Sequence, residues 1–144
     1  MDIIMPGKED IPACAKVYIS AYTEEPWREE YKTEEAEEYI SSFLGSKTKF
    51  CFAAVYGGEI IGVALCMLVP AIGAPFFRIE DFCVSAEKQG GGFGSEFMCL
   101  IEKEAKKLGC DCIMLGTQRD FPSHKFYLKN GFSEIESVLM HKSL

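Results

Sequence analysis

The sequence predicts one mixed α/β domain whose sheet is covered by helices on both faces, and three patterns lead to this fold class. Two apolar, β-branched and aromatic runs, 50–56 and 59–69, are separated by Gly57-Gly58, the two-residue loop that tight β-hairpins favour. A third run, 76–84, has the same composition, and all three are too continuously apolar for a strand with one wet face. From Phe93 onward, apolar residues instead recur at helical spacing with charged residues between them.

The other elements follow from capping and breaking residues along the chain. Asp2 to Met5 is a candidate first strand, and Asp10 is a candidate N-cap for a helix with Pro12 in its first turn. Thr33 is the candidate N-cap of a second helix, which Gly45 ends. The elements predicted after the third strand are a helix from Phe93 to the residue before Gly109, a strand at 112–116, a helix at 123–129 and a strand at 132–141.

Composition narrows the class of protein. Of the 144 residues, 48% are apolar and 26% are charged, as in an ordinary globular protein, and the length fits a single domain over residues 1–144. The net charge of −7, without a Lys/Arg cluster, argues against a nucleic-acid partner. No basic segment precedes an apolar run at the start, and no apolar stretch approaches the roughly 20 residues that span a bilayer. We therefore expect a cytoplasmic protein with no membrane partner.

Neither the cysteines nor the histidines suggest a metal site. The seven cysteines are odd in number, lie mostly in apolar segments and lack paired CxxC spacing, which predicts buried free thiols. His124 and His141, the only histidines, have no metal-ligand or triad companion at a useful spacing. We expect surface or packing roles for both, and no metal.

The segment with the clearest chemistry is a glycine-rich turn between the third long strand and the amphipathic helix. Residues 84–94 read VSAEKQGGGFG. Glycines let successive backbone N–H groups face a ligand, and a helix N-terminus adds positive potential, so this turn could hold a pyrophosphate with its main chain. The spacing is that of neither a P-loop nor a Rossmann fingerprint, and a flexible turn without a ligand is an equal alternative for the glycines alone.

Two blocks of sequence resemble those of one enzyme family. Gln89-x-x-Gly92-x-Gly94, between a strand and a helix, resembles the acetyl-CoA pyrophosphate motif of the GNAT superfamily of N-acetyltransferases. The block SHKFYLKNGF at 123–132 resembles the closing signature of that family, an aromatic-Tyr pair, a spacer and Gly-Phe. The resemblance implies the GNAT fold, with a central, mostly antiparallel mixed sheet of about six to seven strands and helices on both faces. It also implies an acyltransferase with acetyl-CoA as cosubstrate.

The resemblance assigns roles to individual residues. The predicted acetyl-CoA contacts are Phe82, Cys83, Val84, Gln89, Gly90, Gly91, Gly92, Phe93, Gly94 and Ser95. Tyr127 matches the family's tyrosine near the CoA sulfur, where it would act as general acid. Because a phenol has a pKa of about 10, hydrogen bonding to the leaving thiolate is an alternative to full proton transfer, and core packing is the structural alternative. We find no partner that would lower the pKa of Cys83, so we reject a ping-pong mechanism.

Glu80 and Asp81 place two carboxylates in an otherwise apolar strand, where an unpaired buried charge is costly. Strand alternation would send them to opposite faces. Glu80 stands four residues before Val84, where aminoglycoside-type family members carry a glutamate that acts as base, directly or through water. The resemblance therefore makes Glu80 the candidate base and a candidate substrate contact. The alternative is that Glu80 only pairs with Arg78. In that case water alone would serve as the base, as in many members of the family.

The acceptor is predicted to be a small-molecule amine whose identity the sequence does not encode. The glutamate-rich stretch 24–38 could attract a cation, but it is also typical of a solvated helix face. Trp27, the only tryptophan, lies there in a candidate substrate loop. We predict acetyl transfer to a primary amine of a small cationic substrate, polyamine- or aminoglycoside-like, by direct attack in a ternary complex. The alternatives are a non-catalytic acyl-CoA-binding or sensor domain, a protein N-terminal or lysine acetyltransferase, and a structural module. The oligomeric state stays open, with a homodimer as one option.

Overall fold

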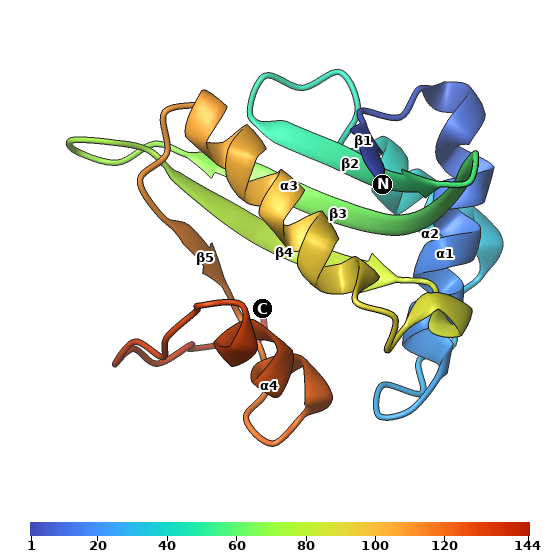
Figure 1. The fold of residues 1–144 in the computed structure, drawn as a ribbon. Helices are drawn as coiled ribbons and strands as arrows, with labels where there is room; N and C mark the ends of the chain where they lie inside the picture. The colour runs from blue at the N-terminus through green and yellow to red at the C-terminus, as the bar shows by residue number, and fades with distance from the viewer.

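A five-stranded sheet in the order β1-β2-β3-β4-β5 forms the centre of the computed structural model, which describes all of residues 1–144 (Figure 1). The strands are β1 (Asp2–Ile4), β2 (Lys49–Tyr56), β3 (Glu59–Val69), β4 (Phe76–Val84) and β5 (Ile113–Leu115). Neighbours from β1 to β4 are antiparallel, and β5 is parallel to β4. The helices are α1 (Ile11–Thr23), α2 (Thr33–Ser41), α3 (Phe93–Lys107) and α4 (Pro122–Lys129), with single 3-10 turns η1 (Lys8–Asp10) and η2 (Ala86–Lys88). The predicted mixed, mostly antiparallel sheet is confirmed.

The β2–β3 hairpin confirms the clearest local prediction. Tyr56 pairs with Glu59, so the loop is the two residues Gly57 and Gly58. Their φ values of 61° and 83° lie in the left-handed region, where a side chain is strained and glycine is not. Two consecutive positive φ values give the turn twist that matches a right-handed hairpin.

Helices cover both faces of the sheet, as predicted. In Figure 1, α3 crosses one face diagonally, and α1 and α2 lie on the other. Cys51 and Leu65 point into a core with α1 and α2, whereas their strand neighbours Phe52 and Ala64 point into a core with α3. Each inner strand is thus buried on both sides, which explains its continuous apolar sequence.

A β-bulge interrupts this alternation in β4. Residues 65 and 66 of β3 pair with Asp81 and Ile79 of β4. Glu80 is therefore an extra residue in the ladder, and a bulge of this kind changes the face to which the following side chains point. Ile79 packs in the α3 core, but Cys83, four residues later, packs in the α1–α2 core. The half of β4 after the bulge consequently presents its odd-numbered residues to α1 and α2.

The predicted strand at 132–141 is wrong, and the sheet has five strands rather than six to seven. After α4 the chain runs with no ladder partner, and Val138, Leu139 and Met140 are 85%, 97% and 88% exposed. Because β5 has only three residues, it offers a short edge for pairing. The polar part of the segment is held by side chains instead, since Glu134 accepts hydrogen bonds from Arg119 at 2.8 Å and contacts His124 at 2.8 Å.

Several smaller features complete the fold. Thr33, the predicted N-cap of the second helix, is instead its first residue; Lys32 is the N-cap, the helix ends at Ser41, and turns continue to Gly45. All seven cysteines are free, and only Cys99 and Cys112 are exposed, which confirms the prediction of mostly buried thiols. No helix combines the length and the apolar character that crossing a membrane requires. No group of three or more His, Cys, Asp or Glu side chains is arranged to hold a metal ion.

Candidate active site

The glycine-rich turn between β4 and α3 has the backbone conformation of an anion cradle. Gly90 and Gly92 have φ values of 77° and 84°, which L-residues with side chains rarely adopt. Gly92 is the N-cap of α3, and no side chain caps this helix. Gln89 fixes the turn against the strand end, because its Nε2 donates to the carbonyl of Val84 at 3.1 Å. The turn is therefore anchored at one end and has an uncapped helix start at the other.

The backbone N–H groups of this turn have no acceptor in the chain. None of those from Gly90 to Ser95 donates a hydrogen bond, and the first donor of α3 is Glu96, which bonds to the carbonyl of Gly92. The first N–H groups of any helix lack intrahelical partners, and together they carry about half a unit of positive charge. A row of such donors on glycines fits the oxygens of a diphosphate.

The last glycine of the motif lets α4 approach α3. A Cβ on Gly94 would lie 3.1 Å from Cε2 of Phe126 in α4. The Phe126 ring packs on Phe82, with centroids 5.7 Å apart, and thereby joins α4 to the end of β4. Phe93 points away from this contact and packs on Tyr56, with centroids 4.8 Å apart. Among the predicted cofactor contacts, Gly94 and the Phe93 side chain thus have packing roles, and only their N–H groups are free for a ligand.

The second half of β4 has an open edge beside this cradle. β5 pairs with β4 only at Phe77 to Ile79. The N–H of Ser85 bonds to β3, so strand alternation turns the backbone groups of Phe82 and Val84 away from β3, toward the edge that β5 leaves free. This edge can pair with an extended amide chain. Cys83 offers no such groups, because its backbone faces β3 and its side chain is buried in the α1–α2 core.

Tyr127 reaches the same part of β4 from α4. Its ring packs between Phe126 and Phe132, at centroid distances of 5.3 and 5.4 Å, and its hydroxyl makes no hydrogen bond within the chain. Burial raises the pKa of the Tyr127 phenol, and the nearby Cys83 and Asp81 groups act in the same direction. The hydroxyl therefore stays protonated and can serve as a hydrogen-bond donor. Burial also raises the pKa of the Cys83 thiol, which disfavours a thiolate nucleophile.

On the opposite face of β4, three tyrosines donate hydrogen bonds to Asp81. The hydroxyls of Tyr18 and Tyr22, both from α1, lie 3.1 Å from Oδ1, and that of Tyr39, from α2, lies 2.8 Å from Oδ2. For all three phenols, burial is the largest cause of a raised pKa, and the charge of Asp81 contributes. The tyrosines therefore remain protonated donors around one carboxylate.

Glu80 is paired with a cation, unlike Asp81, its neighbour in β4. Its Oε1 forms an ion pair with Nε of Arg78 at 2.7 Å, which is the pairing that the sequence left as an alternative. The expectation that Glu80 and Asp81 face opposite sides is wrong. The bulge at Glu80 places Asp81 toward α1 and α2. Phe77 and Ile79 point into the α3 core, so strand alternation sends Arg78 and its partner Glu80 to the other side. Both carboxylates consequently lie on the α1–α2 side.

Trp27 connects the two halves of the site. It lies in the connection between α1 and α2, and its ring contacts Tyr22 and Phe121 at centroid distances of 5.9 and 5.0 Å. Phe121 is the N-cap of α4. Trp27 thus touches the tyrosine cluster on one side and the helix of Tyr127 on the other.

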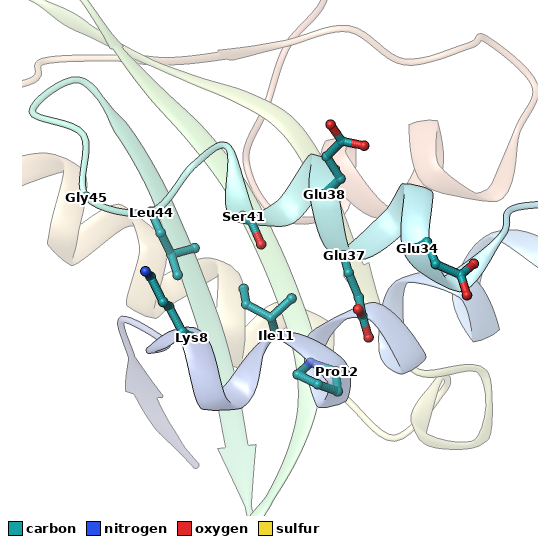
Figure 2. Close-up of a pocket in the computed structure, with 9 residues that line it drawn as sticks. All are labelled: Lys8, Ile11, Pro12, Glu34, Glu37, Glu38, Ser41, Leu44 and Gly45. Carbon is teal, nitrogen blue, oxygen red and sulfur yellow. The ribbon is translucent and has the colours of Figure 1, made fainter.

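Two hollows lie on the α1–α2 side. One, of about 480 Å³, surrounds Asp81, and its lining residues are Tyr18, Tyr31, Glu35, Ala36, Tyr39 and Asp81. The other, of about 590 Å³, lies between the start of α1 and α2 and contains none of the predicted site residues (Figure 2). Its charged lining residues are Glu34, Glu37 and Glu38 of α2 and Lys8 of η1, and in Figure 2 the Lys8 side chain lies beside Leu44 while Glu38 points away from it. Only the smaller hollow is lined by a residue of β4, the strand that carries Glu80 and Asp81.

Sequence reasoning missed the tyrosine cluster. Tyr18 and Tyr22 are four residues apart and so share one face of α1, which is a visible signal. Tyr39 comes from another helix, and Asp81 reaches all three only because of the bulge. His124, for which a surface or packing role was predicted, lies beside Glu134 at the surface.

Comparison with known proteins agrees with this geometry. The sequence model of the acetyltransferase (GNAT) family matches residues 16–132, which is most of the chain and includes both motif blocks. No curated protein sequence matches the chain significantly.

Solved structures share the fold at low sequence identity. A putative acetyltransferase from Agrobacterium tumefaciens superposes with a TM-score of 0.80 at 23% identity, covering 99% of this chain and 100% of that one. An aminoglycoside 6′-N-acetyltransferase from Acinetobacter haemolyticus has a TM-score of 0.80 at 15% identity, with 100% and 99% coverage. A transcriptional regulator from Bacillus halodurans has a TM-score of 0.79 at 22% identity, with 98% and 99% coverage. Together with the family match and the glycine cradle, these structures lead to one conclusion: the chain belongs to the GNAT family of acetyltransferases.

Proposed function

We propose that this acetyltransferase moves the acetyl group of acetyl-CoA to a primary amine of a small cationic substrate, with both substrates bound at once. The observation that carries the proposal is the row of free backbone N–H groups from Gly90 to Ser95 at the start of α3. These donors lie next to the open edge of β4, and Tyr127 approaches the same strand.

The residues present fit acetyl-CoA. The N–H groups of the turn would hold the diphosphate, and Gln89 would keep the turn in place through its bond to Val84. The backbone groups of Phe82 and Val84 on the free edge would pair with the amides of the pantetheine arm. When bound, acetyl-CoA supplies a thioester that a neutral amine can attack.

Tyr127 would donate a hydrogen bond to the sulfur that leaves. Its raised pKa keeps the proton on the phenol at neutral pH, so the role is stabilisation of negative charge on the thiolate rather than complete proton transfer. The Tyr127 hydroxyl is partly buried and donates no hydrogen bond to any group of the chain. It can therefore donate to the sulfur without first breaking another bond.

The ammonium of the acceptor must lose a proton before it can attack. We assign this step to Glu80, directly or through one water, because strand alternation after Ile79 puts its carboxylate on the α1–α2 side of β4, where we place the acceptor. Arg78 holds the Glu80 carboxylate in one orientation through the contact at 2.7 Å. The acceptor nitrogen loses two protons in all: Glu80 takes the first and passes it to solvent, and the second leaves the nitrogen after attack and ends on the thiolate sulfur as the C–S bond breaks.

Cationic acceptors are supported by the charge of the acceptor side and by structural neighbours. The α1–α2 side carries Asp81, Glu80 and Glu35 around or beside the smaller hollow. Two neighbours at 15% identity are described as aminoglycoside acetyltransferases, one of them in complex with sisomicin. Trp27, at the junction of the two halves, is a candidate wall of the acceptor site.

An assay of free thiol with acetyl-CoA and a panel of amines tests the proposal. The panel contains monoamines, diamines, aminoglycosides and a lysine peptide. We expect thiol release with at least one small cationic amine, and a Tyr127→Phe variant with kcat lowered about 10- to 100-fold and unchanged affinity for acetyl-CoA. Glu80→Gln should lower kcat at neutral pH. The loss should be smaller at higher pH, where more of the amine is already neutral. Acetyl-CoA binding without thiol release for any amine would instead indicate a non-catalytic acyl-CoA-binding domain.

A further inference from the structure

Asp81 is a carboxylate without a cation. No lysine, arginine or histidine forms an ion pair with it, whereas Glu80, its neighbour in β4, pairs with Arg78. Its hydrogen bonds come from three neutral phenols. A partly buried charge that only neutral groups solvate leaves the surrounding hollow with negative potential.

The hydrogen-bonding capacity of Asp81 is not exhausted. An ionised carboxylate has about four acceptor positions on its two oxygens. Two phenols share Oδ1 and one binds Oδ2, so Oδ2 retains a position for one more donor. Asp81 is itself one of the residues that line the hollow, so a donor bound there lies within reach of its carboxylate.

Aromatic side chains form most of the wall around this charge. Tyr18 lies at the bottom with 6% of its surface exposed, and Tyr31 and Tyr39 lie at the mouth with 38% and 39% exposed. The rings of Tyr31 and Tyr39 lie 5.6 and 6.2 Å from that of Tyr18. A carboxylate with aromatic side chains lining the hollow beside it is suited to an alkylammonium ion, which is attracted by the charge and by cation–π interaction with the rings.

We propose that this hollow binds an ammonium group of the acceptor other than the amine that is acetylated, so that the substrate class is di- and oligoamines. The inference rests on the proposed function and specifies its acceptor. Asp81 and the tyrosine faces stabilise the charged form of any nitrogen they hold. A charged nitrogen cannot attack a thioester, so the nucleophile has to be a second, more distant nitrogen of the same molecule.

Binding of a probe that cannot act as an amine nucleophile tests the hollow separately from catalysis. The probes are choline, which carries a permanent quaternary charge, and dimethylbutanol, its neutral carbon isostere, each titrated by calorimetry in the absence of acetyl-CoA. We expect choline to bind about tenfold or more tightly than the isostere. Equal affinities, or no binding of choline to folded protein, would overturn the proposal.

Matched variants separate the carboxylate from the aromatic wall. Asp81→Asn keeps an acceptor for the phenols and should remove the preference for choline. Tyr31 donates no hydrogen bond to Asp81, so Tyr31→Leu should lower choline affinity about two- to fivefold, whereas Tyr31→Phe should not. Glu38→Gln removes one charge of α2 that lines the larger hollow, and it should leave choline affinity unchanged (Figure 2). A purely structural Asp81 would give Asp81→Asn less stability and unaltered choline preference.

The catalytic arm compares putrescine with butylamine as acceptors. Wild-type protein should favour putrescine by about tenfold or more in kcat/KM, and Asp81→Asn should lose that preference through KM. Thiol release with equal efficiency for both amines would overturn this inference and leave the proposed function intact. Choline binding as expected, without thiol release for any amine, would support the hollow and overturn the proposed function.

Discussion

The two sides of β4 are built from different parts of the chain. On the α3 side, the free polar groups are backbone N–H groups of a glycine-rich turn. On the α1–α2 side, they are side chains, a carboxylate surrounded by tyrosines from two helices. A main-chain site depends on φ and ψ at a few consecutive positions, whereas a side-chain site depends on how distant elements pack. The first should therefore be sensitive to backbone strain, and the second to loss of single functional groups.

The largest effect is expected from Gly92→Val. The φ of 84° at this position strains any residue with a side chain, and valine is branched at Cβ. No atom lies within 4 Å of a Cβ built there, so the effect comes from the backbone and not from a clash. We expect at least about 100-fold weaker binding of acetyl-CoA in calorimetry, since the donors would turn away from a common point.

Gly58→Val is the matched control for that change. Gly58 has a φ of 83° and equally open surroundings, but it lies in the β2–β3 hairpin. This variant should cost similar stability and bind acetyl-CoA like the wild type. Equal loss of binding in both variants would mean that strain acts through global unfolding, and not through the cradle.

The next largest effect is expected on the stability of the α1–α2 side of β4. Asp81→Ala leaves the three phenols without their shared acceptor, and we expect the free energy of unfolding to fall by about 2 kcal/mol in urea titration. Glu80→Ala removes a partly exposed ion pair and should cost less than about 1 kcal/mol. If the two variants lose the same stability, the tyrosine cluster does not hold α1 and α2 to β4.

Gly94→Ala should have a smaller effect on stability. The new Cβ would lie 3.1 Å from the Phe126 ring, which has to shift, and we expect a cost of about 1 kcal/mol. Because Phe126 precedes Tyr127, kcat should fall while affinity for acetyl-CoA changes little. Gly116→Ala, with nothing near its Cβ and no positive φ, serves as the control and should change neither quantity.

The smallest effect is spectroscopic. Burial and Asp81 raise the pKa of Tyr18, Tyr22 and Tyr39 in the folded state, so the protonated phenols contribute stability below the unfolded pKa of about 10. This stability is lost only as pH rises above that value. Tyrosinate absorbance of folded protein should therefore lag behind that of urea-unfolded protein above about pH 10. Coincident titration curves would show that the phenols are not buried donors.

Local patterns predicted much of the fold and the backbone conformation of the glycine-rich turn. Gly57-Gly58 fixed the hairpin because both residues need positive φ, and the same property marks the turn before Phe93. The glycines of that turn predicted exposed backbone donors, and the N–H groups from Gly90 to Ser95 have no acceptor in the chain; that they bind acetyl-CoA stays a prediction. Tyr127 is singled out by its contiguous block with Gly131 and Phe132, and its role beside the CoA sulfur stays a prediction.

The tyrosine cluster around Asp81 could not be predicted, because it depends on contacts between distant residues. Asp81 meets Tyr18 and Tyr39 across separations of 63 and 42 residues. The bulge at Glu80 that turns Asp81 toward them leaves no signal in the apolar pattern of β4. The strand expected at 132–141 failed for a related reason, since apolar residues alone do not form a strand when the neighbouring edge is three residues long.

The central claim, that main-chain donors of the turn bind the diphosphate, is tested most directly by the amide resonances of 15N-labelled protein titrated with coenzyme A. The account predicts that the largest shifts, in the direction of stronger hydrogen bonding, fall on the N–H signals from Gly90 to Ser95. Unshifted signals at these residues in protein saturated with coenzyme A would contradict it.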